Sequence, residues 1–167
     1  MQDTDELFDV VDNQDAVVGC APRHLCHSRV DFTHRAIFVV VFNKQGDIFL
    51  QQRSATKDTY PLRWTVSVSG HVSSGESYDE AMKRECLEEI GIVVSDWKEL
   101  GKFLWFYPHE TEFSRVYTTE HDGPFILDLS EIVEGRFFSL DTISQLRLEQ
   151  PTFFTPSALR CFALLGF

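Results

Sequence analysis

The stretch GHVSSGESYDEAMKRECLEEIGI, residues 70–92, decides the fold. Its second half predicts a helix over Tyr78–Ile90, because Ser77 is a favourable N-cap and Glu80, at the third helical position, completes a capping box. Gly91 follows at the place where a glycine commonly ends a helix in the left-handed conformation. The stretch therefore predicts a loop, a helix and a closing turn.

Three glutamates are expected on one face of this helix. Glu85, Glu88 and Glu89 have the spacing i, i+3, i+4, which brings their carboxylates together. Like charges at this distance repel one another unless a cation compensates them. Arg84 supplies one positive charge for three acids, whereas Mg²⁺ prefers oxygen ligands and binds through a few carboxylates, water and substrate phosphates. The spacing predicts a magnesium site, with a solvated acidic face as the alternative.

The wider pattern favours the metal site. Gly70, five residues, Glu76, seven residues and then RECLEEIGI, residues 84–92, resemble the Nudix box, Gly-x5-Glu-x7-Arg-Glu-U-x-Glu-Glu-x-Gly-U, in which U is a bulky aliphatic residue. Seven fixed residues and the final aliphatic residue match this signature. Cys86 stands at the first aliphatic position, where a small hydrophobic residue can still face the core.

The resemblance implies an α/β fold, the Nudix-type α/β/α sandwich with a mixed sheet. It implies that Glu76 and Arg84 hold the loop and the glutamates in place. The expected metal is Mg²⁺, with Mn²⁺ as an alternative, and its implied ligands are the carbonyl of Gly70 and the carboxylates of Glu85, Glu88 and Glu89.

The implied reaction is hydrolysis of a nucleoside diphosphate linked to another group. The metal would neutralise diphosphate oxygens and activate a water molecule. A carboxylate would accept the proton of that water. Glu89 is the first candidate for this base, and Glu131 and Glu134, outside the box, are alternatives.

A second resemblance covers the region before the box. FDVVDNQDAVVG (8–19), His27 and the stretch THRAIFVVVFNKQGDIFLQQRSATKDTYPLRWT (33–65) resemble type I isopentenyl-diphosphate isomerases. That family holds a metal with three histidines and a Glu-x-Glu pair, and it binds the diphosphate with an arginine and a lysine. The matching residues here are His27, His34, His71, Glu110 and Glu112 for a second metal, Zn²⁺ or Mn²⁺, and Arg53 and Lys57 for the diphosphate.

One residue separates the two enzyme classes. The isomerases use as acid and base a cysteine that lies two positions before the histidine corresponding to His71. This chain has Ser69 at that position. A serine hydroxyl has a pKa far above the value of about 8.5 for a thiol, so it is a poor proton shuttle near neutral pH. Ser69 and the intact glutamates favour a hydrolase, with the isomerase as the first alternative and a non-catalytic diphosphate-binding module as the second.

The composition limits the partners. The chain has 167 residues, and 15 Lys and Arg against 26 Asp and Glu give a net charge of −11. This balance is unsuitable for binding nucleic acid or an anionic membrane, and no apolar run is long enough to span a bilayer. We expect a small-molecule diphosphate as partner, and a homodimer is compatible with the sequence. Four cysteines at irregular spacings, typical of reduced thiols, indicate a cytoplasmic protein.

The rest of the chain predicts one domain, residues 1–167, in which strands and helices mix without regular βαβ alternation. The apolar run 36–43 is expected as a central strand covered on both faces. The other expected elements are a hairpin from 7–12 and 16–21, a helical segment at 22–30, strands at 48–52, 64–69, 97–107, 112–120 and 135–140, and a helix at Pro156–Leu164 capped by Thr155.

Overall fold

The expected central strand, β3 (His34–Phe42), organises a seven-stranded sheet in a computed structural model that describes residues 6–167. The strand order is β5-β4-β3-β8-β7, with β6 also paired to β3 and β9 to β4. The sheet is mixed, because β3 and β8 are parallel and the other pairs are antiparallel. The remaining elements are β1 (Leu7–Val11), β2 (Val17–Pro22), β4 (Ile48–Arg53), β5 (Trp64–Thr65), β6 (Val68–His71), β7 (Lys98–Phe106), β8 (Thr111–Glu120), β9 (Ile132–Phe138), α1 (Arg23–Cys26), α2 (Tyr78–Ile90), α3 (Leu140–Glu149) and α4 (Pro156–Leu164).

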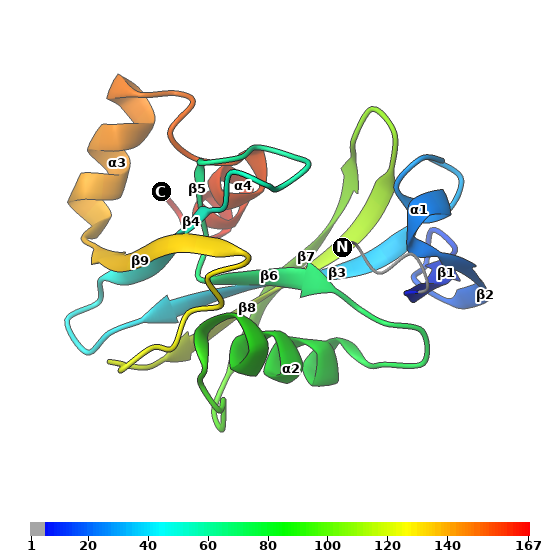
Figure 1. Cartoon of the computed structure of the whole chain (residues 1–167), viewed down its shortest axis with the longest axis horizontal. Coiled ribbons are helices and arrows are strands. Elements are labelled where there is room, and N and C mark those ends of the chain that lie inside the picture. The colour runs from blue at the N-terminus through cyan, green and yellow to red at the C-terminus, as the bar shows by residue number, and fades with distance from the viewer. Residues whose placement is uncertain (1–5) are drawn as a thin grey trace.

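Helices cover both faces of this sheet (Figure 1). Successive residues of a strand point to opposite faces, so β3 contributes to two cores. The core shared with α2 includes Ile37, Val39, Val41, Met82 and Ile90. The core shared with α3 and α4 includes Phe38, Val40, Ile143, Ala158 and Phe162. The result is the expected α/β/α sandwich in a single domain.

The helix α2 has the predicted bounds and caps. The Ser77 hydroxyl accepts a hydrogen bond from the Glu80 backbone N–H at 3.2 Å, and the Glu80 carboxylate accepts one from the Ser77 N–H at 2.9 Å. Gly91 ends the helix with φ +70°. Cys86 is fully buried, as expected for its position in the box. The helix Pro156–Leu164 and its Thr155 cap are also confirmed.

The segment 64–69 is not one strand, as predicted, but two. The Ser67 hydroxyl accepts a hydrogen bond from the Val41 N–H at 2.7 Å and donates one to the Phe49 carbonyl at 2.5 Å. This side chain replaces backbone pairing at the break, so β5 pairs with β4 and β6 pairs with β3.

Other boundaries were also predicted wrongly. The helical segment at 22–30 is only α1, four residues long, and a single turn is too short to be stable without tertiary contacts. The last strand lies at Ile132–Phe138 instead of 135–140. The helix α3 was not predicted, because the apolar residues that precede Ser139 suggested a strand, although Ser139 is its N-cap and accepts a hydrogen bond from the Thr142 N–H.

The predicted N-terminal hairpin is confirmed as β1 and β2, a separate two-stranded sheet. It packs on the loop before α2, where the Ser74 N–H donates to the Leu7 carbonyl at 2.8 Å and the Ser74 hydroxyl donates to Asp9 at 2.7 Å. Among the described residues, no helix has both the length and the apolar character needed to cross a membrane.

The two glycines Gly91 and Gly46 provide a matched test of the α2 end. Both have positive φ, but a Cβ on Gly91 would lie 2.8 Å from the Ile126 Cβ, whereas a Cβ on Gly46 would have no atom within 4 Å. We expect Gly46→Ala to lower the free energy of unfolding by about 1 kcal/mol through backbone strain alone. Gly91→Ala should lose a further 1 kcal/mol or more, on the order of an overpacked core site. Urea unfolding of both variants measures this, and equal losses would contradict the contact.

Candidate active site

The carboxylate of Glu89 lies where two strands of the sheet separate. β4 pairs with residues 41–42 of β3 and β6 with residues 36–39, so these two strands follow one another along β3. Glu89 Oε2 accepts hydrogen bonds from Gln51 Nε2 on β4, at 2.8 Å, and from the Ser69 N–H on β6, at 3.3 Å. The helix therefore places a carboxylate in the gap between β4 and β6.

Burial changes the acidity of this carboxylate and of its neighbour. Glu89 is only 7 % exposed, and burial, with a contribution from the charge of Glu85, raises its pKa to about 8, although Gln51 opposes the shift. Burial also raises the pKa of Glu85 to about 7, against the opposing charge of Arg84. Both groups are thus costly to ionise without a cation nearby.

Gly70 is required by the position of Glu85. A Cβ on Gly70 would lie 2.2 Å from the Glu85 Cδ and 2.3 Å from its Oε1. The Glu85 carboxylate therefore occupies the space where any other residue would have its side chain.

Arg84 joins the loop to the glutamates. Its guanidinium donates to both carboxylate oxygens of Glu76 at 2.9 Å and to the His71 carbonyl at 3.0 Å. The same group donates to Glu85 at 2.7 Å and to Glu88 at 3.1 Å. Of the three helix glutamates, Glu88 is the most exposed, with 58 % of its side chain accessible. The Arg84 guanidinium thus fixes the loop and the orientation of the Glu85 and Glu88 carboxylates.

The donors around Gly70 fit a hard divalent cation. They are oxygen atoms only, and two of the carboxylates are held in a desolvated position by the sheet on one side and Arg84 on the other. A divalent ion bound by carboxylates in such a position would offset the charge that burial disfavours.

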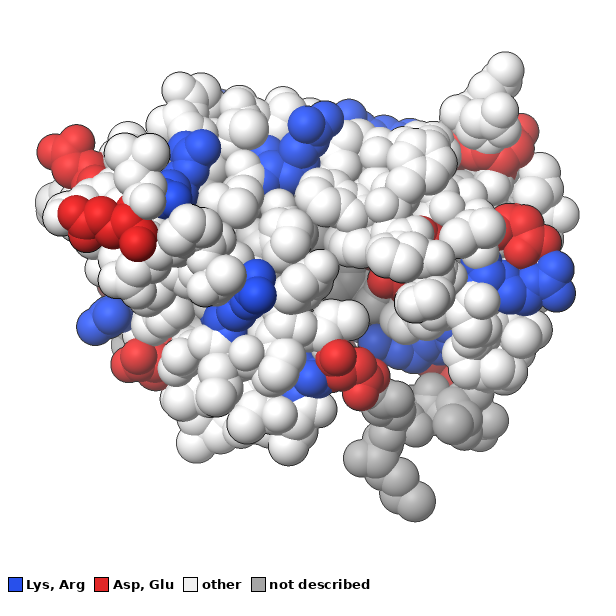
Figure 2. Space-filling model, turned by 90° about the horizontal axis from the view of Figure 1, so that it is seen from above, with Lys and Arg blue, Asp and Glu red and all other residues white. Residues whose placement is uncertain are grey.

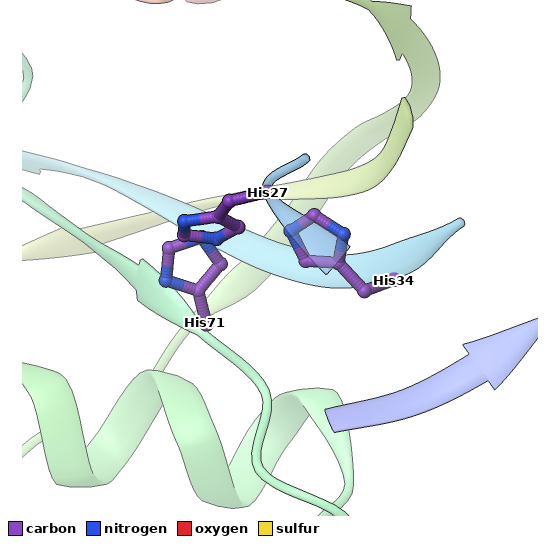
Figure 3. A group of neighbouring side chains, drawn as sticks. All are labelled: His27, His34 and His71. Carbon is purple, nitrogen blue, oxygen red and sulfur yellow. The ribbon is translucent and has the colours of Figure 1, made fainter. Parts of the chain in front are cut away.

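The three predicted histidines lie together on the opposite side of β6 from α2 (Figure 3). The sheet register explains this, because the parallel pairing of β3 with β8 sets His34 beside Glu112 and the pairing of β3 with β6 sets Ala36 beside His71. His27 joins them from the C-terminal end of α1. Residues from four separate elements therefore converge.

One ring nitrogen each from His27, His34 and His71 can be chosen so that the three atoms lie within 4.8 Å of one another. Two nitrogens bound at about 2.1 Å in the tetrahedral arrangement usual for Zn²⁺ would be about 3.4 Å apart, so the rings would have to move closer together to bind one metal. His34 is fully buried, and its Nε2 is one of two buried side-chain polar atoms without a hydrogen-bond partner among the described residues. An unpaired buried nitrogen is costly, which favours a ligand at this point.

Two glutamates face the histidines. Glu110 Oε2 lies 3.7 Å from His27 Nε2, and Glu112 Oε2 lies 4.0 Å from His34 Nε2 and 3.9 Å from His71 Nε2. Burial lowers the pKa of His27 to about 4 and that of His34 to about 3 and holds that of His71 well below its usual value. The imidazoles are therefore neutral at pH 7, the form that binds metals.

The predicted diphosphate residues lie in and before the loop between β4 and β5. Arg53 ends β4, and its guanidinium donates to the Thr59 carbonyl at 3.0 Å. Burial lowers the pKa of Arg53, and the charges of Glu89 and Glu131 oppose this shift, so the cation lies near the glutamate site. Lys57 pairs with Glu131. Glu134, the other alternative base, lies exposed on β9.

Gln51 is the site residue that the sequence analysis missed. It is 3 % exposed, and its Nε2 donates to Ser67 O at 3.1 Å as well as to Glu89. No decisive signal in the sequence pointed to it, because the strand IFLQQR has two adjacent glutamines and only the structure shows that Gln51 is the buried one.

Comparisons with known proteins identify the family of the chain. The family model described as "NUDIX domain" matches residues 32–156. An uncharacterized Nudix hydrolase of Pseudomonas aeruginosa, PA4841, is 34% identical over 132 residues, which are 79% of this chain and 78% of the relative. A Nudix hydrolase of Deinococcus radiodurans is 33% identical over 141 residues, 81% of this chain and 80% of the relative.

Solved structures show the same fold. DR0079 from Deinococcus radiodurans superposes with a TM-score of 0.79 at 25% identity, over 96% of this chain and 98% of that one. The NUDIX domain of NrtR from Shewanella oneidensis, solved with ADP ribose, has a TM-score of 0.65 at 12% identity, over 83% of this chain and 86% of that one. The chain belongs to the Nudix family, and with its hydrolase relatives it is a Nudix hydrolase.

Replacing Gly70 tests the arrangement of the glutamates. In Gly70→Ala the new methyl group must displace the Glu85 carboxylate, so we expect Mg²⁺ affinity to fall about tenfold or more, as for other changes that disturb the orientation of metal ligands. Gly19→Ala is the control, because a Cβ on this strand glycine would have no atom within 4 Å. Calorimetric titration of Mg²⁺ measures the effect, and unchanged affinity in Gly70→Ala would place the metal elsewhere.

Proposed function

We propose that the protein is a Mg²⁺-dependent hydrolase that cleaves a diphosphate linkage in a small molecule. Its substrate class is a nucleoside diphosphate linked to another moiety, or a related diphosphate. The observation that carries the proposal is the arrangement of two desolvated carboxylates: Glu85 lies against Gly70 and accepts from Arg84, Glu89 is buried between β4 and β6, and burial raises their pKa values to about 7 and about 8. Strongly raised carboxylate pKa values of this kind are typical of catalytic and metal-binding groups.

The chain supplies each function that the reaction needs. Bound at the Gly70 carbonyl, Glu85, Glu88 and Glu89, Mg²⁺ would neutralise diphosphate oxygens and lower the pKa of a bound water molecule. Arg53 and Lys57 would hold the diphosphate through charge-assisted hydrogen bonds. Glu76, through Arg84, would keep the glutamates oriented.

Glu89 is the best-placed general base. Both of its hydrogen bonds fall on Oε2, so Oε1 is the oxygen that can meet a water molecule or a metal. A divalent ion beside it would keep this carboxylate ionised, which is the form that can accept a proton. ADP ribose, the molecule present in the NrtR structure, belongs to the proposed substrate class and should head the substrate panel.

A second metal is proposed at His27, His34 and His71 with Glu110 and Glu112. Three imidazoles and two carboxylates suit Zn²⁺ or Mn²⁺ better than Mg²⁺. This set is the feature that keeps isopentenyl-diphosphate isomerase as the alternative function. Ser69 argues against it, because its backbone N–H serves Glu89 and its side chain carries no thiol.

The charge pattern and the cysteines fit the remaining proposals. On the face in Figure 2, basic and acidic side chains are interspersed, which is unsuitable for the backbone of a nucleic acid. The same view shows a narrow recess with acidic atoms inside it. All four cysteines are free thiols, in accord with action in the cytoplasm. A homodimer remains compatible with the chain.

Glutamine substitutions on α2 test the proposed activity. A panel of ADP ribose, other nucleotide sugars, dinucleotides, nucleoside triphosphates and prenyl diphosphates with Mg²⁺ should identify a substrate through its phosphate products. For that substrate we expect Glu88→Gln and Glu89→Gln to lower kcat about a hundredfold or more with the fold retained, because each removes a metal-binding charge.

Matched variants keep this test specific. Glu149→Gln, at the exposed end of α3, should leave kcat unchanged. A large loss in Glu134→Gln with near-normal rates in both α2 variants would contradict the assignment. Solvent deuterium in dimethylallyl diphosphate, formed from isopentenyl diphosphate, would support the isomerase instead.

Two histidine variants test the second metal. His27 is a half-buried member of the cluster, whereas His24, three residues earlier, is exposed and outside it. We expect His27→Ala to weaken Zn²⁺ binding about tenfold or more and His24→Ala to leave it unchanged. Zn²⁺ affinity measured by competition with a chromophoric chelator decides this. Equal affinities in the two variants would show that the cluster does not bind Zn²⁺.

A further inference from the structure

The loop between β4 and β5, residues 54–63, is closed at its neck. The Arg53 N–H donates to the Arg63 carbonyl at 3.0 Å, and the Leu62 N–H donates to the Arg53 carbonyl at 3.1 Å. Tyr60 and Leu62 have φ values of +50° and +60°, which are strained for residues with a side chain. A loop held in such a conformation needs contacts outside itself to fix its position.

Glu131 provides two such contacts. Its backbone carbonyl accepts a hydrogen bond from the Ser54 N–H at 2.8 Å, and its carboxylate pairs with the ammonium of Lys57. Glu131 lies at the end of the segment 121–131, just before β9, and so belongs to a different part of the chain from the loop. The carbonyl bond fixes the base of the loop, and the ion pair fixes the lysine.

The same segment is attached to α2. The Glu131 N–H donates to the Asp128 carbonyl at 3.0 Å, and the Asp128 N–H donates to the carbonyl of Glu89 at 2.9 Å. Asp128 is itself held by the Ser130 N–H at 2.9 Å and the Ser130 hydroxyl at 2.7 Å. A continuous series of contacts therefore runs from the Lys57 ammonium to the peptide of Glu89.

The ion pair leaves Lys57 able to act in the site. An ammonium has three donors, and its pairing with Glu131 Oε2 uses one of them. The paired carboxylate belongs to the residue whose peptide is joined through Asp128 to the carbonyl of Glu89. The lysine is thus fixed relative to α2 while donors remain for an anion.

We propose that Glu131 is the positioning residue for Lys57: its carboxylate holds the ammonium where it meets the substrate diphosphate, and it is not the general base. This proposal rests on the proposed function, since it takes Lys57 as a diphosphate-binding residue. It assigns a role to a residue that the sequence analysis could name only as an alternative base.

Binding of imidodiphosphate, a diphosphate that is not hydrolysed at its bridging nitrogen, tests the proposal without requiring turnover. Calorimetric titration with saturating Mg²⁺ would compare Lys57→Met, Glu131→Gln and the double variant. Glu131→Gln keeps the backbone bond to Ser54 and removes only the charge. We expect it to weaken binding about fivefold, the order of one partly exposed charge pair. In the Lys57→Met background it should have no further effect, because the two residues act through one contact.

The control is Asp122→Asn. It makes the same change of charge by removing the Lys44–Asp122 pair, in which the Lys44 Nζ and Asp122 Oδ2 are 2.9 Å apart on the surface. This variant should bind imidodiphosphate like the unchanged protein. An equal loss in Asp122→Asn would show that net charge alone explains the effect and would overturn the proposal.

The kinetic readout separates positioning from proton transfer. With the substrate found by the panel, Glu131→Gln should raise KM and leave kcat nearly unchanged. A fall in kcat of about a hundredfold that persists in Lys57→Met would instead make Glu131 the base and overturn the proposal. If Lys57→Met itself binds imidodiphosphate normally, the diphosphate role of Lys57 fails as well. If only Glu131→Gln is without effect, the positioning role alone fails.

Discussion

The rest of the structure depends on the desolvation of the Glu89 carboxylate between β4 and β6. An ionised carboxylate is costly to bury, and in the proposed enzyme a divalent ion would join the two hydrogen-bond donors of Glu89 in stabilising its ionised form. The Ser67 side chain ends the pairing that would otherwise close this gap, and Gln51 fills it with an amide. The separation of the two strands therefore makes room for the Glu89 carboxylate between them.

Strand β6 places two different sets of ligands on its two sides. Gly70 lies against Glu85 on the α2 side, and His71 points into the histidine cluster on the other. Arg84 connects them, since its guanidinium contacts the glutamates and the carbonyl of His71. The oxygen set suits a hard cation and the nitrogen-rich set suits a transition metal, so this short strand would separate the two proposed metal sites.

The sequence predicts best those features that depend on local spacing. The bounds of α2, its capping box and its closing glycine lie within one stretch of 23 residues, residues 70–92, and each has a local physical cause. The histidine and Glu-x-Glu set came from a resemblance, and the pairing of His34 with Glu112 and of Ala36 with His71 brings its members together.

Features that depend on tertiary contacts could not be predicted in the same way. The break at Ser67 depends on hydrogen bonds to two other strands, and the pairing of Lys57 with Glu131 joins residues far apart in the chain. Gln51 is recognisable only when its strand is known to be buried beside α2. The missed helix α3 shows the same limit, because its cap was present but apolar neighbours indicated a strand.

The most direct measurement is the release of protons when Mg²⁺ binds, obtained by calorimetry at pH 7 in buffers of different ionisation enthalpy. With pKa values of about 8 and about 7, Glu89 and Glu85 are substantially protonated in the metal-free protein at this pH, and a metal must replace those protons. The account predicts release of about one proton per Mg²⁺, decreasing toward zero as the pH rises above about 9. Mg²⁺ binding with no proton release at pH 7 would contradict it.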